Sequence, residues 1–297
     1  MTQEEVAEHH RNSRPRGNGS TRWPAKGEKL RVLVITRGHP FPRDPFFAIF
    51  ERNHEIEWAN VEHPAAQHFF TSELAREFDC YVLYDMPGIE FMPGAPPVFF
   101  EPPDHFKEGL RAMTQIGAPF VVLHHAMAAW PAWPEWAEFV GGQFLYQPMA
   151  SRGRDLPDSG YRLDVTHTIS PVSDHPITEG IEPFELVDEL YLAPIFEDSI
   201  TPLFRSNFEF IDSNFFSARR ALEGKINCRD DWSHPPGSNI VGWVKRYEKS
   251  PIAYLQFGDG PSAYENPTFQ KILANAIRWA ASEGARNFAD AASEGST

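Results

Sequence analysis

The chain has 297 residues, of which 41% are hydrophobic, 13% aromatic and 23% charged. Apart from the aromatic excess, this composition is ordinary for a globular protein, and the length suits one α/β domain with decorations. The net charge of −14 argues against nucleic-acid binding, because a phosphate backbone would be repelled. No apolar run is long enough to span a membrane, and the N-terminus lacks the apolar core of a signal peptide. We therefore expect a cytoplasmic enzyme or binding protein with neither nucleic-acid nor membrane partners.

Residues 1–29 form a predicted polar arm. They are rich in Arg, Asn, Gly and Pro, and their six basic residues outnumber their four glutamates. A segment of this composition buries too little apolar surface to fold alone. We expect its basic side chains to lie against an acidic surface of this chain or of a second subunit.

The first half of the chain alternates predicted strands and helices. Asp44 and Pro45 indicate the N-cap and first position of a short helix. Predicted strands cover residues 30–36, 54–60, 80–85 and 121–123, and predicted helices cover 44–52, 72–78 and a segment ending near 116. This alternation is typical of a doubly wound, mostly parallel sheet, so the sequence predicts an α/β, flavodoxin-like fold.

The second half has fewer predicted helices. Its predicted strands cover residues 161–168, 199–204, 240–244 and 251–257. Residues 205–237 mix aromatic and charged side chains without clear periodicity, as an insertion or lid would. Apolar residues at helical spacing predict a last helix over 267–281, and residues 284–297 resemble a frayed tail. We interpret residues 30–283 as one α/β domain.

Histidines follow two of the predicted strands. The apolar run that ends at Leu123 stops on His124 and His125, and the first strand is followed by His39. Ligands of open α/β sheets bind beyond the carboxyl ends of such strands, so we favour a functional role for His39 and His124. Neighbouring side chains on an extended chain point to opposite sides, so we expect His124 and His125 to differ in role. For His125, a hydrogen bond into the next helix or the sheet rim is an equal alternative.

Several ordered motifs resemble one family, the ThuA-like proteins named for trehalose utilisation. The motifs are Gly38-His39, Val122-Leu123-His124-His125-Ala126, Gly141-Gly142-Gln143-Phe144, His175-Pro176-Ile177-Thr178-Glu179-Gly180, Asp188-Glu189-Leu190-Tyr191, Trp243 and Ile277-Arg278-Trp279-Ala280. The resemblance spans residues 30–282 and implies a fold similar to that of class I glutamine amidotransferases. It also implies a role in sugar catabolism.

The chain departs from the family pattern near the last strand. The resemblance implies a Gly-Lys-Gly-Arg turn before that strand and a Gly-His pair after it. This sequence has Glu248-Lys249-Ser250-Pro251 and Gly258-Asp259 instead. Asp259 therefore occupies a position after the last strand where a histidine is usual, which changes the ligand and proton chemistry available there.

The two cysteines do not suit glutamine amidotransfer. That reaction needs a thiolate at the turn after a central strand, activated by a histidine. The turn here carries His124, whereas Cys80 opens another strand and Cys228 lies in the insertion. We expect that the protein is not a glutamine amidotransferase.

Imidazoles and carboxylates at these positions favour acid–base chemistry. We expect His39 and His124 to act with Glu189 or Asp188, two residues whose place in the family motif outweighs the simpler interpretation of a solvated acidic surface. The same groups suit a divalent metal, most plausibly zinc, bound by His39, His124 and Glu189. A metal-free acid–base site is the competing hypothesis.

Further candidates would bind substrate. The polar ones are His125, Asp85 and Asp259. The aromatic ones are Trp130, Tyr191 and Trp243, although core packing competes for each, as it does for Trp133 and Trp136. The resemblance implies an enzyme acting on a disaccharide, glycoside or keto-sugar as a lyase, hydrolase or isomerase. The alternative is a non-catalytic carbohydrate-binding or regulatory module.

The phenylalanines of the insertion predict self-association. If Phe208, Phe210, Phe215 and Phe216 were exposed, they would form an apolar patch that monomers seldom tolerate. Together with the basic arm, they predict a homodimer. The alternative is that the insertion folds over its own active site as a lid.

Overall fold

A single ten-stranded sheet organises the computed structural model, which describes residues 28–91 and 97–291. The strand order is β10-β9-β11-β13-β14-β6-β3-β1-β2, with β12 paired to β9. Five strands are parallel: β2 (Ile56–Glu62), β1 (Leu30–Arg37), β3 (Cys80–Asp85), β6 (Phe120–Leu123) and β14 (Ser250–Leu255). This part of the sheet confirms the predicted α/β class.

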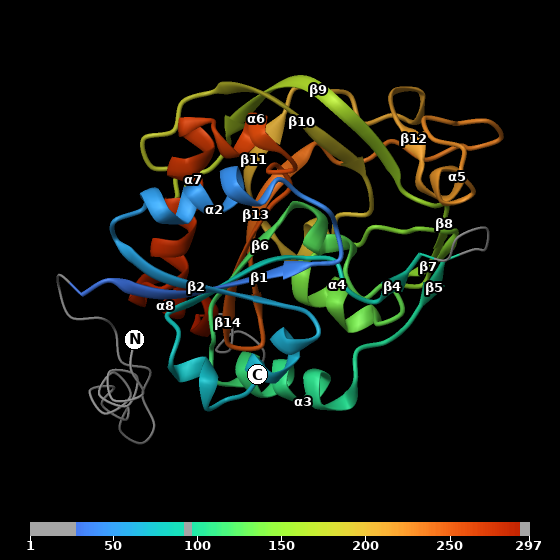
Figure 1. Cartoon of the computed structure of the whole chain (residues 1–297). Helices are drawn as coiled ribbons and strands as arrows, with labels where there is room; N and C mark the ends of the chain where they lie inside the picture. The colour runs from blue at the N-terminus through green and yellow to red at the C-terminus, as the bar shows by residue number, and fades with distance from the viewer. Residues whose placement is uncertain (1–27, 92–96, 292–297) are drawn as a thin grey trace.

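Antiparallel strands extend the sheet on one side. They are β13 (Ile240–Tyr247), β11 (Thr201–Ser206), β9 (Gly160–Pro171), β10 (Phe184–Leu192) and β12 (Phe216–Ser217). The long β9 and β10 arch across the top of Figure 1. Two small hairpins lie apart from the sheet: β4 (Ile89–Glu90) with β5 (Val98–Phe99), and β7 (Met149–Ser151) with β8 (Arg154–Leu156).

Helices cover both faces of the parallel strands, because the side chains of those strands are buried on both sides. Along β1, Val32 and Val34 join one apolar core cluster, and Leu33 and Ile35 join the other. The first cluster includes residues of α2 (Arg43–Arg52), α6 (Pro261–Tyr264), α7 (Pro267–Ala280) and α8 (Glu283–Asp290). The second includes residues of α3 (Asp104–Gln115) and α4 (Pro134–Val140), and Figure 1 shows α2 and α7 well apart from α3.

Three local predictions were wrong. The helix α2 begins at Arg43 with Pro42 as its N-cap, so Asp44 lies in the first turn. Its carboxylate there still interacts favourably with the positive end of the helix dipole. The predicted helix over 72–78 is only a 3₁₀ turn, Leu74–Arg76. Residues 283–290 are not frayed but form α8, whose N-terminus is capped because the Ser282 hydroxyl accepts a hydrogen bond from the Ala285 N–H.

The insertion does not present an apolar patch. Phe210 and Phe215 are buried, and Phe208 packs against them. Phe216 is half-buried, with the guanidinium groups of Arg162 and Arg229 at 4.9 and 4.6 Å from its ring centroid. The prediction of a homodimer assumed exposed phenylalanines, and that assumption was wrong. Its other basis was the basic arm, whose residues 1–27 lie outside the described residues. The homodimer stays a prediction without structural support.

The insertion contains the short helix α5 (Ala218–Leu222) as well as β12. Ala218, Ala221, Leu222 and Ile226 line the pocket described below, which favours the lid interpretation. No helix among the described residues is long and apolar enough to cross a membrane.

Candidate functional site

The site is built on the turn that follows β6. Leu123 is extended, but His124 has a positive φ of 44° and opens a 3₁₀ helix that runs to Ala128. The Tyr254 hydroxyl donates a hydrogen bond to the His124 carbonyl at 2.9 Å, which holds this left-handed turn. The prediction that His124 and His125 point to opposite sides assumed an extended chain. It was wrong, because the chain turns at His124 and leaves the two ring centroids 5.6 Å apart.

The His124 ring is completely buried and has partners on both nitrogens. Its Nδ1–H donates to the backbone carbonyl of Gln256. Its Nε2 lies 3.0 Å from Glu189 Oε2, 2.7 Å from the Tyr191 hydroxyl and 3.3 Å from Asp259 Oδ1. Burial opposes a charge on this ring, but the hydrogen bonds and negative charges of Asp259 and Glu189 outweigh it and raise the pKa of His124 well above its usual value. The ring is therefore an imidazolium between two carboxylates.

Glu189 and Asp188 lie on β10, a strand that the sequence analysis missed. Their carboxylates have different partners, at a register shift in the pairing of β10 with β9 between Asp188 and Leu190. Glu189 reaches His124, whereas the Asp188 carboxylate accepts hydrogen bonds from the backbone N–H groups of Gly258 at 2.6 Å and Asp259 at 3.0 Å. Burial raises the pKa of Asp188 to about 6. Asp188 thus fixes the loop that carries Asp259 and does not face the pocket.

Gly38 brings His39 to the site. Gly38 has φ +98°, and a Cβ at this position would lie 2.2 Å from the Met86 carbonyl oxygen, so only glycine fits the turn. The His39 ring centroid lies 4.6 Å from that of His125. Burial is the main cause that lowers the pKa of His39.

The His125 side chain is buried deeper than His39. Its ring lies 4.2 Å from the Tyr84 ring, and neither ring nitrogen has a hydrogen-bond partner among the described residues. Burial, together with the charges of His39 and His124, lowers the pKa of His125 well below its usual value. No hydrogen bond of ordinary geometry links the His125 ring to the described residues of the next helix or the sheet rim, although the backbone of Tyr84, near the end of β3, favours its charged form. Burial prevails, and His125 is a neutral imidazole.

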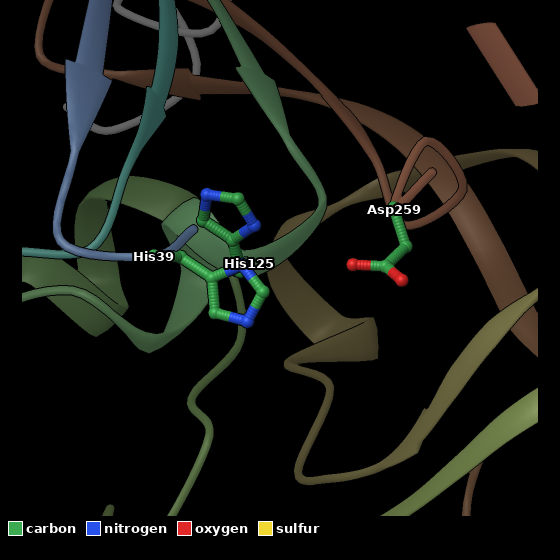
Figure 2. A group of neighbouring side chains, drawn as sticks. All are labelled: His39, His125 and Asp259. Atoms are coloured by element: carbon green, nitrogen blue, oxygen red, sulfur yellow. The ribbon is translucent and has the colours of Figure 1, made fainter. Parts of the chain in front are cut away.

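Asp259 completes the cluster from the loop after β14. Its backbone carbonyl accepts hydrogen bonds from the Tyr84 and Tyr264 hydroxyls, at 3.1 and 2.6 Å. Burial opposes the charge of its carboxylate, but His124 outweighs burial and lowers the pKa of Asp259. In Figure 2 the carboxylate is directed toward the paired rings of His39 and His125. The potential ligand atoms of these three residues all lie within 4.8 Å of one another, and the same holds for His124, Glu189 and Asp259.

A pocket of about 500 Å³ opens beside this cluster. Two of the described residues that line it carry an imidazole or a carboxylate: His39 and Glu189. The Tyr191 hydroxyl is a further polar group in the lining. The rest of the lining is mainly apolar and aromatic. It consists of Met86, Phe91, Pro97, Ala128, Phe144, Tyr146, Tyr161, Ala218, Ala221, Leu222 and Ile226.

The structure does not bring Asp85, Trp130 or Trp243 to this pocket. Asp85 is buried and pairs with His63 at 2.7 Å. Trp130 is 1% exposed and belongs to the core beneath the pocket. Trp243 packs on Tyr254 and donates its indole N–H to the Val140 carbonyl. Core packing therefore explains both tryptophans.

Sequence reasoning missed Gln256 and the aromatic lining. The Gln256 carbonyl accepts the His124 Nδ1–H bond, and its side-chain Oε1 accepts from the Tyr191 N–H at 3.1 Å, so it fixes both His124 and Tyr191. Its signal was present, since it is a polar residue placed directly after the apolar run of the last strand. Phe144 and Tyr146 follow the Gly141-Gly142 turn, which the sequence analysis did not connect with a site.

Comparisons with known proteins identify one family. The family model for ThuA, described as trehalose utilisation, matches residues 31–280. A ThuA-like protein from Parabacteroides merdae is 15% identical, with a TM-score of 0.60 over 86% of this chain and 91% of the other. A ThuA-like protein from Bacteroides uniformis is 14% identical, with a TM-score of 0.57 over 89% of this chain and 96% of the other. A cytoplasmic protein from Salmonella typhimurium is 12% identical, with a TM-score of 0.50 over 84% and 98%. No curated protein matches the sequence.

Proposed function

Because this chain belongs to the ThuA family of trehalose utilisation, we propose that it is a carbohydrate-catabolic enzyme that transfers protons in the pocket beside Glu189. We also propose that it acts in the cytoplasm, the compartment named for the similar Salmonella structure. Glu189 is the base in this proposal. The observation that carries it is the contact between the Glu189 carboxylate, which lines the pocket, and the buried His124 imidazolium at 3.0 Å.

The His124 imidazolium would act through Glu189. It is completely buried and does not line the pocket, so it does not touch substrate. Its contact with Glu189 orients the carboxylate, as a fixed partner does for a general base. His124 is thus a positioning residue. Gln256 holds His124 in place, and Asp188 holds the loop that carries Asp259. His39 and Tyr191 remain as hydrogen-bonding groups for substrate oxygens.

The number of carboxylates in the pocket favours proton transfer over hydrolysis. Glycosidases use two carboxyl groups that flank the scissile bond. Among the described lining residues, Glu189 is the only carboxylate. A single base beside hydrogen-bonding groups suits proton abstraction next to a carbonyl, which points to a keto-sugar as substrate.

In such a reaction Glu189 takes a proton from the carbon beside the carbonyl. The electron pair of that C–H bond forms an enolate, whose oxygen accepts hydrogen bonds from Tyr191 or His39. Delivery of the proton to the former carbonyl carbon, with transfer of a hydroxyl proton between the two oxygens, completes an isomerisation. Departure of an alkoxide from the next carbon, followed by its protonation, completes an elimination.

The pocket lining suits a sugar ring on one side. Aromatic faces such as that of Tyr191 pack against the apolar faces of pyranoses, while Glu189 and His39 offer polar contacts at the same end. The same lining would also suit a binding or regulatory module that holds a carbohydrate without converting it, which is the second hypothesis.

A panel of sugars tests the proposal. The purified chain is incubated in D₂O with a non-reducing disaccharide, an aryl glycoside and the keto derivative of each, and ¹H NMR follows the sugars. We expect the keto derivatives to exchange the proton beside the carbonyl and to form product, and the unoxidised sugars to stay intact. Saturable binding without change in any sugar would instead support the binding module. Absence of both binding and turnover would contradict the carbohydrate assignment.

A further inference from the structure

We propose that His39, His125 and Asp259 form a binding site for one divalent first-row transition metal ion, next to the Glu189 base. This set differs from the predicted one of His39, His124 and Glu189. It comes from three separate loops: those after β1, β6 and β14 (Figure 2).

The arrangement of donor atoms is the first argument. The ligand atoms of the three residues lie within 4.8 Å of one another, so small side-chain movements bring them to the spacing around one ion. The turn at Gly38 and the hydrogen bonds that Asp188 accepts from Gly258 and Asp259 fix the two outer loops. Such bracing of ligand-bearing segments is typical of metal sites.

The state of His125 is the second argument. This imidazole is 1% exposed, and neither ring nitrogen has a hydrogen-bond partner among the described residues. Buried polar groups are normally satisfied, so an imidazole with two bare nitrogens requires an explanation. Figure 2 shows its ring beside that of His39, with the Asp259 carboxylate directed toward the pair. A metal ion between them would supply a partner for one of the His125 nitrogens.

The contacts of His124 favour His125 over it as the ligand from the loop after β6. The Nδ1–H of His124 donates to Gln256, and its Nε2 is surrounded by Glu189, Tyr191 and Asp259. Both nitrogens are thus already engaged by protein groups. The corresponding nitrogens of His125 have no such partners.

Two imidazoles and one carboxylate define the class of ion. Imidazole favours zinc and its first-row neighbours, whereas magnesium and calcium prefer oxygen ligands. Of the three ligands, His39 lines the pocket, so the remaining coordination positions face the substrate. An ion there would bind a substrate oxygen beside Glu189.

Equilibrium metal binding tests this inference without any substrate. The chain is purified without a histidine tag, treated with chelator and titrated with Zn²⁺ by calorimetry, with Mg²⁺ as the comparison. We expect one Zn²⁺ per chain and no comparable Mg²⁺ binding. His125→Asn and Asp259→Asn should each weaken Zn²⁺ binding by at least about 100-fold. His39→Asn, on a loop that is partly exposed, provides a third variant if His125→Asn fails to fold.

A surface histidine pair supplies the matched control. The rings of His68 and His105 are stacked at 5.4 Å on exposed residues, outside the three loops that carry the proposed ligands. His105→Asn should leave the single tight site unchanged. Zn²⁺ binding that is lost with His105→Asn, or that survives loss of His125 and Asp259, would overturn the inference, as would the absence of stoichiometric binding. Co²⁺ loaded in place of Zn²⁺ gives a second readout, since its visible absorption should change in His39→Asn. Because no sugar is present, failure here leaves the proposed proton transfer untouched.

Discussion

Glu189→Gln is expected to lower kcat on the keto-sugar substrate by about 10²–10⁴-fold, the contribution typical of a general base. The substitution keeps the size and hydrogen-bonding capacity of the side chain but removes the carboxylate that lines the pocket. We expect KM to change much less, because the pocket is otherwise intact. Steady-state kinetics on the best substrate of the panel measure both constants.

Glu185→Gln is the matched control. Glu185 lies on the same strand, β10, but is exposed to solvent. Its replacement should leave kcat and the melting temperature unchanged. Equal loss of kcat in both variants would show that charge or strand stability, and not a base at Glu189, sets the rate.

His124→Asn is expected to destabilise the fold by about 3 kcal/mol. The imidazolium compensates Glu189 and Asp259, and removing one partner of a buried ion pair leaves uncompensated charge. Asparagine is the appropriate replacement because it tolerates the left-handed backbone at this position, where φ is 44°. Chemical denaturation gives the free energy of unfolding of each variant.

A double variant separates charge from packing. If the loss comes from the uncompensated carboxylate, adding Glu189→Gln to His124→Asn should restore part of the free energy of unfolding. His54→Asn, at an exposed position, is the control for a histidine change alone. Strictly additive losses in the double variant would contradict an electrostatic coupling between His124 and Glu189.

The sequence predicted the parallel half of the sheet because its inner strands, β1, β3, β6 and β14, are buried on both faces and contain long apolar runs. In β3 and β6 every residue is buried. The pattern failed for β10, where Asp188 and Glu189 interrupt the apolar residues and adjacent acids are typical of a solvated surface. Both carboxylates are buried there because tertiary partners, the His124 ring and the backbone N–H groups after β14, satisfy them. Local periodicity contains no information about such partners.

The candidate site was predictable in part. Strand-end reasoning singled out His39 and His124, but it assigned opposite directions to His124 and His125 because a left-handed turn cannot be read from Leu123-His124-His125. The tryptophans were ambiguous for a similar reason. Trp130 and Trp243 fill the core under the site, a choice that depends on neighbours distant in sequence. Asp259 was predicted as a departure from the family pattern and as a substrate-binding candidate, whereas in the fold it is a partner of His124 and lies near His39 and His125.

A crystal structure of Glu189→Gln soaked with the keto-sugar tests the central claim most directly, since the variant should bind substrate without converting it. We predict that the sugar lies in the pocket, with the carbon beside its carbonyl next to the residue at position 189 and its carbonyl oxygen toward His39 and Tyr191. A sugar bound elsewhere on the molecule, or bound here with that carbon turned away from position 189, would contradict the account.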